Sequence, residues 1–237
     1  MRSHLLWLAL LAACGRVGFD DAAGDAAQEG DAPGACVHLF CDDLEDPAFG
    51  AWGGVQLDGS ATVERDAGFG RTGGSLHAVS PVGSAIAYRY VDAFPAVQAG
   101  DQWVRFMLYV ATGTPLDMEP VSFMDPTRAA EIVFGLFDTD VDVHSHGFAT
   151  DFNITQPIAA ARDRWVCYEL HVRFATVGLV ELYRDGVLVV ASGAPTAPPA
   201  GIVLSRLGIG VASKPTTFSA AVWVDDVAAD TARIGCR

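Results

Sequence analysis

Two stretches of this sequence place an apolar side chain at every second position, and this alternation constrains the fold more than any other feature. In DQWVRFMLYVA (residues 101–111) the even-numbered positions from 104 to 110 are all apolar. In DRWVCYELHVRF (residues 163–174) the even-numbered positions from 166 to 174 are aliphatic or aromatic. A period of two places such side chains on one face of a β-strand. The pattern therefore predicts two long strands, each with one face in the core.

The rest of the chain favours β-structure as well. VELYRDGVLVVAS (residues 180–192) contains an Asp-Gly pair that favours a tight hairpin turn, and SGAPTAPPAG (residues 192–201) is typical of a loop. Neither an amphipathic helix nor an internal repeat is recognisable. The prediction is an all-β fold, a two-sheet antiparallel sandwich, formed by a single domain over residues 36–237. Further strands are expected at 36–42, 75–80, 84–91, 131–137, 202–212 and 217–228.

The charge of the chain limits its partners. The formal net charge is −14, and Lys214 is the only lysine. This balance argues against nucleic acid and against an anionic lipid surface as binding partners. The hydrophobic content of 51% is ample for a large core.

The N-terminus is typical of an exported protein. Residues 1–13 combine an early charge with an apolar run too short to span a membrane, which predicts a signal peptide. LAACG (residues 11–15) resembles the bacterial lipobox, and this resemblance implies that Cys14 is acylated and anchors the protein to a membrane. Gly15 after the cysteine favours the outer membrane or the cell surface. The alternative is an ordinary secretory signal. Residues 14–35 are small and acidic and predict a flexible tether.

Several motifs resemble the laminin-G-like and concanavalin A-like jelly rolls, a fold of lectins and glucanases. They are RWVCYELHVRF followed by GLVELYRDGVLV, an opening LEDPAFGAW and GRTGGSLHAVS, and a closing VWVDDVAADTARIGC. The resemblance covers most of residues 36–237 and implies a jelly-roll sandwich. It also implies a structural calcium ion between Glu45 and Asp226, with Asp43 and Asp225 nearby, because calcium prefers oxygen ligands. Two acidic turns that only aid solubility are the alternative.

Four cysteines remain after Cys14, and an even number in an exported chain predicts two disulfides with three possible pairings. Cys36 and Cys41 are five residues apart, so on one strand they would face opposite ways. In the resembling folds the first strand lies beside the last one. This arrangement favours the pairs Cys36–Cys236 and Cys41–Cys167.

The outward side chains of the two alternating strands are candidates for ligand binding. Aromatic rings on the exposed side of a sheet either lie under a loop or stack on a ligand, and sugars offer apolar faces to such rings. The predicted ligand-binding residues are Trp103, Arg105, Tyr109, Trp165, Glu169, His171 and Arg173. Coverage of this face by the chain's own loops is the alternative.

FDTDVDVHSH (residues 137–146) is a second candidate site. It lacks the glycine and glutamate that an EF-hand calcium loop needs, and its aspartates do not match the glutamates of concanavalin A-like glycoside hydrolases. The favoured interpretation is a turn at 138–140 followed by a strand, with Val141 and Val143 inward and the polar residues on a solvated outer face. Asp142 and His144 as an acid–base pair of a polysaccharide-cleaving enzyme are the alternative.

These expectations favour a cell-envelope lipoprotein with a noncatalytic carbohydrate-binding domain. One alternative is a secreted polysaccharide hydrolase or lyase that acts in the groove of the sheet. Another alternative is a structural or protein-binding envelope module. No cofactor other than calcium is expected.

Overall fold

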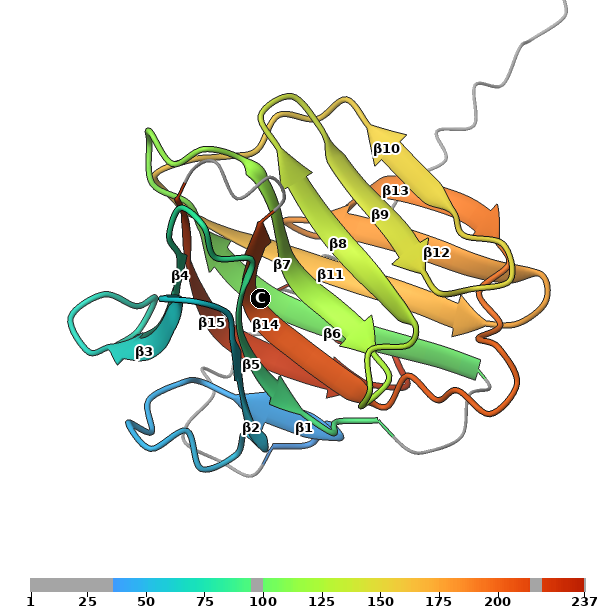
Figure 1. Ribbon diagram of the computed structural model, residues 1–237, viewed down its shortest axis with the longest axis horizontal. Coiled ribbons are helices and arrows are strands. Elements are labelled where there is room, and N and C mark those ends of the chain that lie inside the picture. Colours follow the sequence, from blue (N-terminus) through green and yellow to red (C-terminus); the bar gives the residue numbers. More distant parts are fainter. Residues whose placement is uncertain (1–35, 95–99, 214–218, 237) are drawn as a thin grey trace, which may run out of the picture. The chain divides into compact units, whose positions relative to one another are not determined.

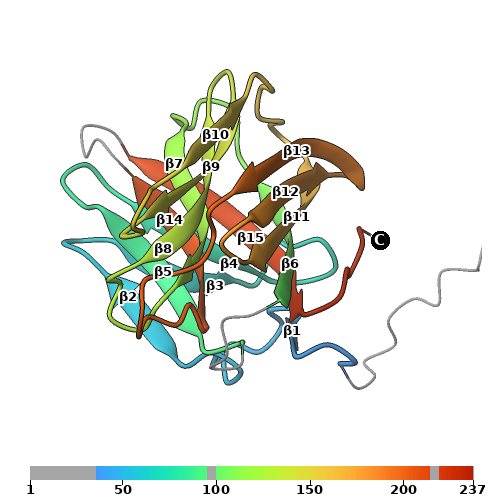
Figure 2. The ribbon, with the colours of Figure 1, turned by 90° about the vertical axis from the view of Figure 1, so that its right-hand side faces the viewer.

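The computed structural model describes residues 36–94, 100–213 and 219–236. The predicted signal peptide, Cys14 and the tether lie outside the described residues. Within the described part the regular structure consists of strands, and no helix there is long and apolar enough to cross a membrane. The strands form two antiparallel sheets that face each other (Figures 1 and 2). The all-β, two-sheet sandwich predicted from the sequence is confirmed.

The first sheet has eight strands in the order β13-β12-β11-β6-β15-β4-β3, and β1 pairs with β15. Its strands are β1 (Phe40–Asp42), β3 (Thr62–Asp66), β4 (Ser75–Ser80), β6 (Gly100–Tyr109), β11 (Trp165–Phe174), β12 (Gly178–Arg184), β13 (Val187–Ala194) and β15 (Ala220–Asp230). The two alternating stretches of the sequence, β6 and β11, are antiparallel neighbours in the middle of this sheet.

The second sheet has seven strands in the order β10-β9-β8-β7-β14-β5-β2. They are β2 (Gly54–Leu57), β5 (Ile86–Val91), β7 (Asp117–Met124), β8 (Glu131–Phe137), β9 (Val141–His146), β10 (Asn153–Gln156) and β14 (Arg206–Ser213). The sequence patterns did not predict β2, β3, β7 or β10. In β7 the reason is Pro120, which is uncommon inside a strand and concealed the pattern.

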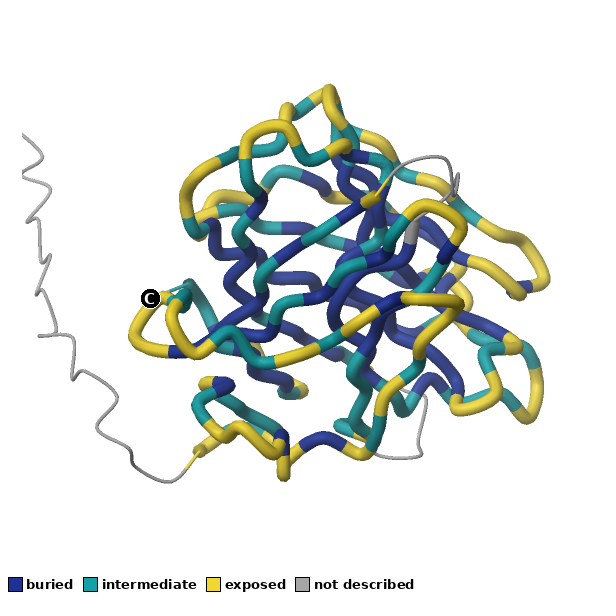
Figure 3. Tube along the Cα trace, turned by 60° about the vertical axis from the view of Figure 1, so that its left-hand side comes forward, coloured by how far each residue is buried: buried dark blue, intermediate teal, exposed yellow. Residues whose placement is uncertain are grey.

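The core lies between the sheets and is formed by the inward half of each alternating strand. In β6 the side chains of Val104, Phe106 and Leu108 are almost completely buried, and Phe106 contacts the rings of Phe134 and Tyr168 from the two sheets. Figure 3 shows buried residues running along the strands and exposed residues mainly in the connecting loops. The period of two thus places the core residues as expected.

The predicted disulfide pairing is wrong. The pairs are Cys36–Cys41 and Cys167–Cys236, with Cα–Cα distances of 5.9 and 5.8 Å. The expected strand at 36–42 is shorter, because residues before Phe40 bend, and this bend brings Cys36 back to Cys41. The first and last strands do pair, with Phe40 opposite Ala229, but Cys236 lies beyond the end of β15 and reaches β11 instead.

Candidate functional site

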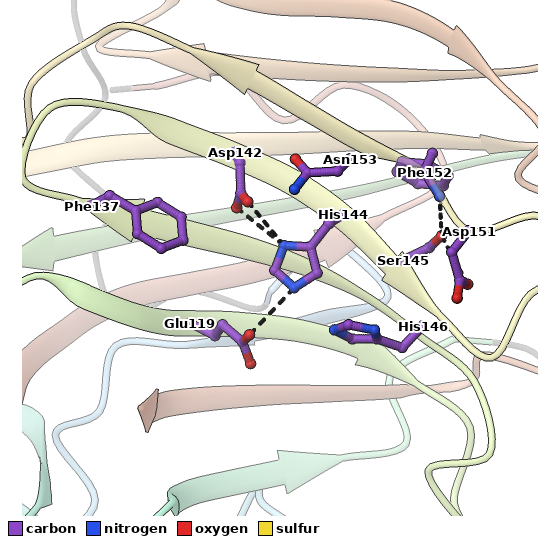
Figure 4. A pocket seen from close by; sticks show the side chains of 9 residues that line it. All are labelled: Glu119, Phe137, Asp142, His144, Ser145, His146, Asp151, Phe152 and Asn153. Carbon is purple, nitrogen blue, oxygen red and sulfur yellow. Dashed lines mark hydrogen bonds and ion pairs between the residues drawn. The ribbon is translucent and has the colours of Figure 1, made fainter. Parts of the chain in front are cut away.

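A pocket opens on the face of the seven-stranded sheet that points away from the core (Figure 4). Its volume is about 510 Å³, within the range of small-ligand pockets. It lies over β7, β8, β9 and β10 and contains several polar side chains. The lining residues are Glu119, Phe137, Asp142, His144, Ser145, His146, Asp151, Phe152 and Asn153.

Strand β9 supplies the floor of the pocket through its alternation. Val141 and Val143 point into the core, and Asp142, His144 and His146 project from the opposite face. The inward and outward assignment made from the sequence agrees with this arrangement. The solvated outer face expected from the sequence is not observed, because Asp142 is only 4% exposed and His144 only 9%.

Glu119 reaches the same floor from β7, two strands away. The pairing of β7 with β8 shifts register between Met118 and Val121, which is a β-bulge that contains Glu119 and Pro120. Bulges redirect side chains and are common next to active sites. Sequence reasoning missed Glu119. The proline beside it was the available signal, because a proline within a strand is typical of an edge or a bulge.

His144 lies between two carboxylates. Its Nδ1 is 3.1 Å from Asp142 Oδ1, and its Nε2 is 3.3 Å from Glu119 Oε1 (Figure 4). Burial alone would lower the pKa of His144, but the hydrogen bonds and charges of Asp142 and Glu119 outweigh it and raise the pKa to about 9. The imidazole is therefore a cation near neutral pH. Burial, and then the charges of the same two residues, raise the pKa of neighbouring Asp117.

A glycine makes room for this array. Gly135 on β8 lies directly opposite Asp142 on β9. A Cβ at this position would lie 2.0 Å from Asp142 Oδ1, so any larger residue would displace the carboxylate. The polar floor of the pocket thus depends on the missing side chain of a neighbouring strand.

The predicted ligand-binding residues do share the outer face of the eight-stranded sheet. The expected exposure of its central members is incorrect, because Trp103 is only 8%, His171 3% and Glu169 0% exposed. Trp103 stacks on His171, and Arg233 lies over the ring of Tyr183 beside them. The chain's own side chains and C-terminal segment occupy the space that a ligand would need.

Glu169 attaches the C-terminal segment to this face. Its carboxylate accepts hydrogen bonds from the backbone N–H groups of Ile234 and Gly235 and from Arg233 Nε. The Cys167–Cys236 disulfide holds the same segment from its far end. A carboxylate with these partners has a structural role, so its burial argues against the predicted role in ligand binding.

The remaining members of the predicted row lie at the margins of this covered area. Tyr109 and Trp165 are half-buried and pack against Phe69, which also contacts Trp223. Arg173 is exposed and bonds Asp101. Arg105 is half-buried opposite Glu169. Sugar binding by these residues stays a prediction.

The predicted calcium ligands gather around the loop that precedes β4. Glu45 accepts hydrogen bonds from Arg65 and from the backbone of Gly74. Asp225 accepts from the backbone of Arg71, whose guanidinium bonds Asp226. The oxygens of Glu45, Asp225 and Asp226 are thus bonded to protein donors, and Asp43 is exposed. Calcium would have to displace these donors, so its binding stays a prediction.

Comparison with known proteins identifies relatives by fold only. No family model and no curated protein matches the sequence. A solved structure of the cellulose induced protein Cip1 superposes with a TM-score of 0.65 at 16% identity, covering 84% of this chain and 100% of Cip1.

Two lyases share the fold as well. The endo-β-1,4-glucuronan lyase of the fungus Trichoderma reesei gives a TM-score of 0.66 at 14% identity, covering 81% of this chain and 95% of the lyase. The alginate lyase vAL-1 from Chlorella virus gives 0.58 at 8% identity, covering 81% and 99%. At these identities the likeness shows the fold, a jelly-roll sandwich.

Proposed function

We propose that this protein acts on a polysaccharide in the pocket over β7, β8 and β9, and that it cleaves the chain as a lyase. The observation that carries the proposal is the buried series Asp142–His144–Glu119 at the floor of an open pocket. Buried, interacting titratable groups in a cleft are typical of catalytic sites. The sequence favoured a noncatalytic carbohydrate-binding domain, and this series of residues favours the enzymatic alternative instead.

The arrangement of the two carboxylates favours elimination over retaining hydrolysis. Retaining hydrolysis requires two carboxyl groups that face each other across the bond to be cleaved, about 5–5.5 Å apart. Here Glu119 and Asp142 lie on opposite sides of one imidazole and both contact it. An elimination instead needs one proton acceptor and one cationic donor, which Glu119 and His144 offer.

The proposed reaction uses a uronate sugar, because the acidic proton must lie next to a carboxylate. Glu119 takes this proton, the neighbouring carbon–oxygen bond of the glycosidic linkage breaks, and a carbon–carbon double bond forms in the sugar. The leaving oxygen receives a proton from His144, which Asp142 holds in place through Nδ1. The glucuronan lyase and the alginate lyase with this fold support the substrate class.

The test is incubation of the purified protein with alginate, glucuronan and neutral polysaccharides such as cellulose. We expect ultraviolet absorbance from the new double bond with a uronate polymer only. Glu119→Gln should reduce this rate by about 100-fold or more, because acid–base groups contribute on that order. Asp43→Asn, an exposed carboxylate elsewhere, is the matched control. Reducing ends without the absorbance would indicate a hydrolase.

Noncatalytic glycan binding in the same pocket is a second candidate. The observation in its favour is that both ring nitrogens of His144 already have carboxylate partners. Affinity electrophoresis in gels containing each polysaccharide distinguishes it. Retardation without any product, abolished by His146→Ala in the pocket mouth, would support binding and contradict cleavage.

The cellular location is proposed from the sequence alone. We propose that Cys14 is acylated and holds the domain at the outer membrane or cell surface, where extracellular polysaccharides are accessible. Labelling with a radioactive fatty acid should mark the wild type and a Cys36→Ser variant but not Cys14→Ser. A labelled Cys14→Ser protein would contradict the anchor.

A further inference from the structure

Three side chains in the pocket can reach a common point. Among the described residues, Glu119, His144 and His146 form a group whose potential ligand atoms all lie within 4.8 Å of one another. They come from two strands separated by β8, with Val133 opposite His144 there. The group is thus assembled by the sheet and not by a local turn.

One spacing in the group already matches a metal site. Ligand atoms bonded at about 2.0–2.2 Å to a tetrahedral zinc ion lie about 3.3–3.6 Å apart. His144 Nε2 and Glu119 Oε1 are 3.3 Å apart. His146 follows His144 by two residues on the same face, and their ring centroids are 4.9 Å apart. A side-chain rotation of the exposed His146 can complete the set without moving the backbone.

Asp142 provides the support that a metal-binding histidine needs. Its carboxylate lies 3.1 Å from His144 Nδ1, so this nitrogen donates a proton to it. Nε2 is then the nitrogen that faces Glu119, and a metal ion would displace the proton that the cationic ring carries there. Metal-bound histidines commonly donate their other ring nitrogen to a carboxylate in this way, which fixes the tautomer and the ring orientation.

We propose that Glu119, His144 and His146 bind a divalent transition metal ion, with zinc as the expected ion. Two imidazoles and one carboxylate favour zinc and its neighbours over calcium or magnesium, which prefer oxygen ligands alone. Three protein ligands leave a fourth position for water or substrate, and all three residues line the pocket. Open positions are typical of catalytic zinc sites.

The metal site goes beyond the proposed function and does not rest on it. Glu119 and His144 Nε2 cannot bind an ion and transfer protons at the same time, so the ion-loaded pocket would hold a uronate sugar and the metal-free pocket would cleave it. Glu119, Asp142 and Asp151 make the pocket acidic, which disfavours the carboxylate of a uronate sugar. A divalent ion held by the three ligands would offset most of this negative charge, and its open coordination position could bind the sugar carboxylate. An acidic polysaccharide is then the substrate class that the loaded pocket accepts.

Metal binding can be tested without a substrate. The purified full chain is stripped with a chelator and titrated with zinc by calorimetry and with cobalt by visible absorption. We expect one ion per chain, with the cobalt spectrum of a four-coordinate site. His146→Ala should weaken binding by more than about 100-fold and Asp142→Asn by about 10–100-fold, as an orienting residue does. His146 is exposed, so its loss should leave the melting temperature of the metal-free chain unchanged.

His38→Ala is the matched control, because it removes an imidazole that bonds Asp230 on the other sheet. It should bind zinc like the wild type. A wild type that binds neither ion, or binding that His146→Ala leaves unchanged, overturns the metal site. Zinc binding without any polysaccharide cleavage keeps the metal site and removes the lyase. Cleavage by a chain that binds no zinc keeps the lyase and removes the metal site.

Discussion

Trp103 stacks on His171 with ring centroids 3.9 Å apart and planes only 5° from parallel. The two residues are cross-strand neighbours on β6 and β11, and His171 is further bonded to Asp101 and Glu181. The ring that resembled a sugar platform in the sequence is therefore an internal contact. This distinguishes the two outer faces of the sandwich, since one is filled by its own side chains and the other carries the pocket.

Replacement of Trp103 should therefore affect stability. Trp103 is 92% buried by its contacts, and truncation of such an aromatic side chain costs about 3–5 kcal/mol of unfolding free energy. We expect Trp103→Ala to lower the urea midpoint while polysaccharide cleavage at saturating substrate persists. Truncation of exposed Val177 serves as the control and should leave the midpoint unchanged. Normal stability of Trp103→Ala would mean that the stack contributes nothing.

Asp101 should make this face sensitive to acid. Burial opposes ionisation, but hydrogen bonds from His171 and Arg173 outweigh it and lower the pKa of Asp101 below its usual 3.8. A lowered carboxyl pKa stabilises the fold above the unfolded value and loses this effect as the pH falls through the folded value. Asp101→Asn should thus lower the urea midpoint at pH values well above 3.8 and have little effect below the folded pKa. A difference that persists unchanged in strong acid would contradict this assignment.

The two disulfides should differ in their contribution to stability. In the chain-entropy model the 69-residue separation of Cys167–Cys236 corresponds to about 4 kcal/mol, and the five-residue separation of Cys36–Cys41 to about 2 kcal/mol. Cys236→Ser should also release the segment above Trp103 and increase quenching of tryptophan fluorescence by acrylamide. Cys36→Ser is the matched control, and equal quenching in both variants would show that the segment stays in place without its disulfide.

The sequence was sufficient to predict which side chains face the core between the sheets. It was not sufficient to predict what covers their outer faces. Alternation assigns each residue of β6, β9 and β11 to a face, which is why Val143 and Phe106 were correctly placed inward. It contains no information about which distant segment covers the other face. The C-terminal segment over Trp103 is such a case, because its position depends on Glu169 and on a disulfide between residues far apart in the chain.

For the same reason, only part of the candidate site could be predicted from the sequence. Asp142 and His144 lie in one strand, so their common face followed from the period of two. Glu119 joins them through a bulge two strands away, and local patterns do not indicate which strands become neighbours. The predicted disulfide pairing failed for a local reason, because the residues before Phe40 form a bend and not the expected strand.

Gly135→Ala tests the geometry of the site without removing any polar group. The added Cβ would lie 2.0 Å from Asp142 Oδ1 and must displace this carboxylate from His144. The raised pKa of His144, about 9, should then fall toward its ordinary 6.5 in the metal-free chain, as followed by nuclear magnetic resonance. Zinc affinity should drop by about 10–100-fold, as for Asp142→Asn.

The same variant has a consequence for stability that depends on pH. A histidine with a raised folded pKa contributes stability that is complete below 6.5 and is lost as the pH rises through about 9. Wild-type unfolding free energy should therefore fall over this range, and Gly135→Ala should show a weaker fall. Gly193→Ala on β13 is the matched control, because its added Cβ would meet only the backbone oxygen of Gly178 at 3.8 Å, an ordinary contact. If Gly135→Ala leaves the pKa of His144 at about 9, the bond to Asp142 is not what holds the proton there.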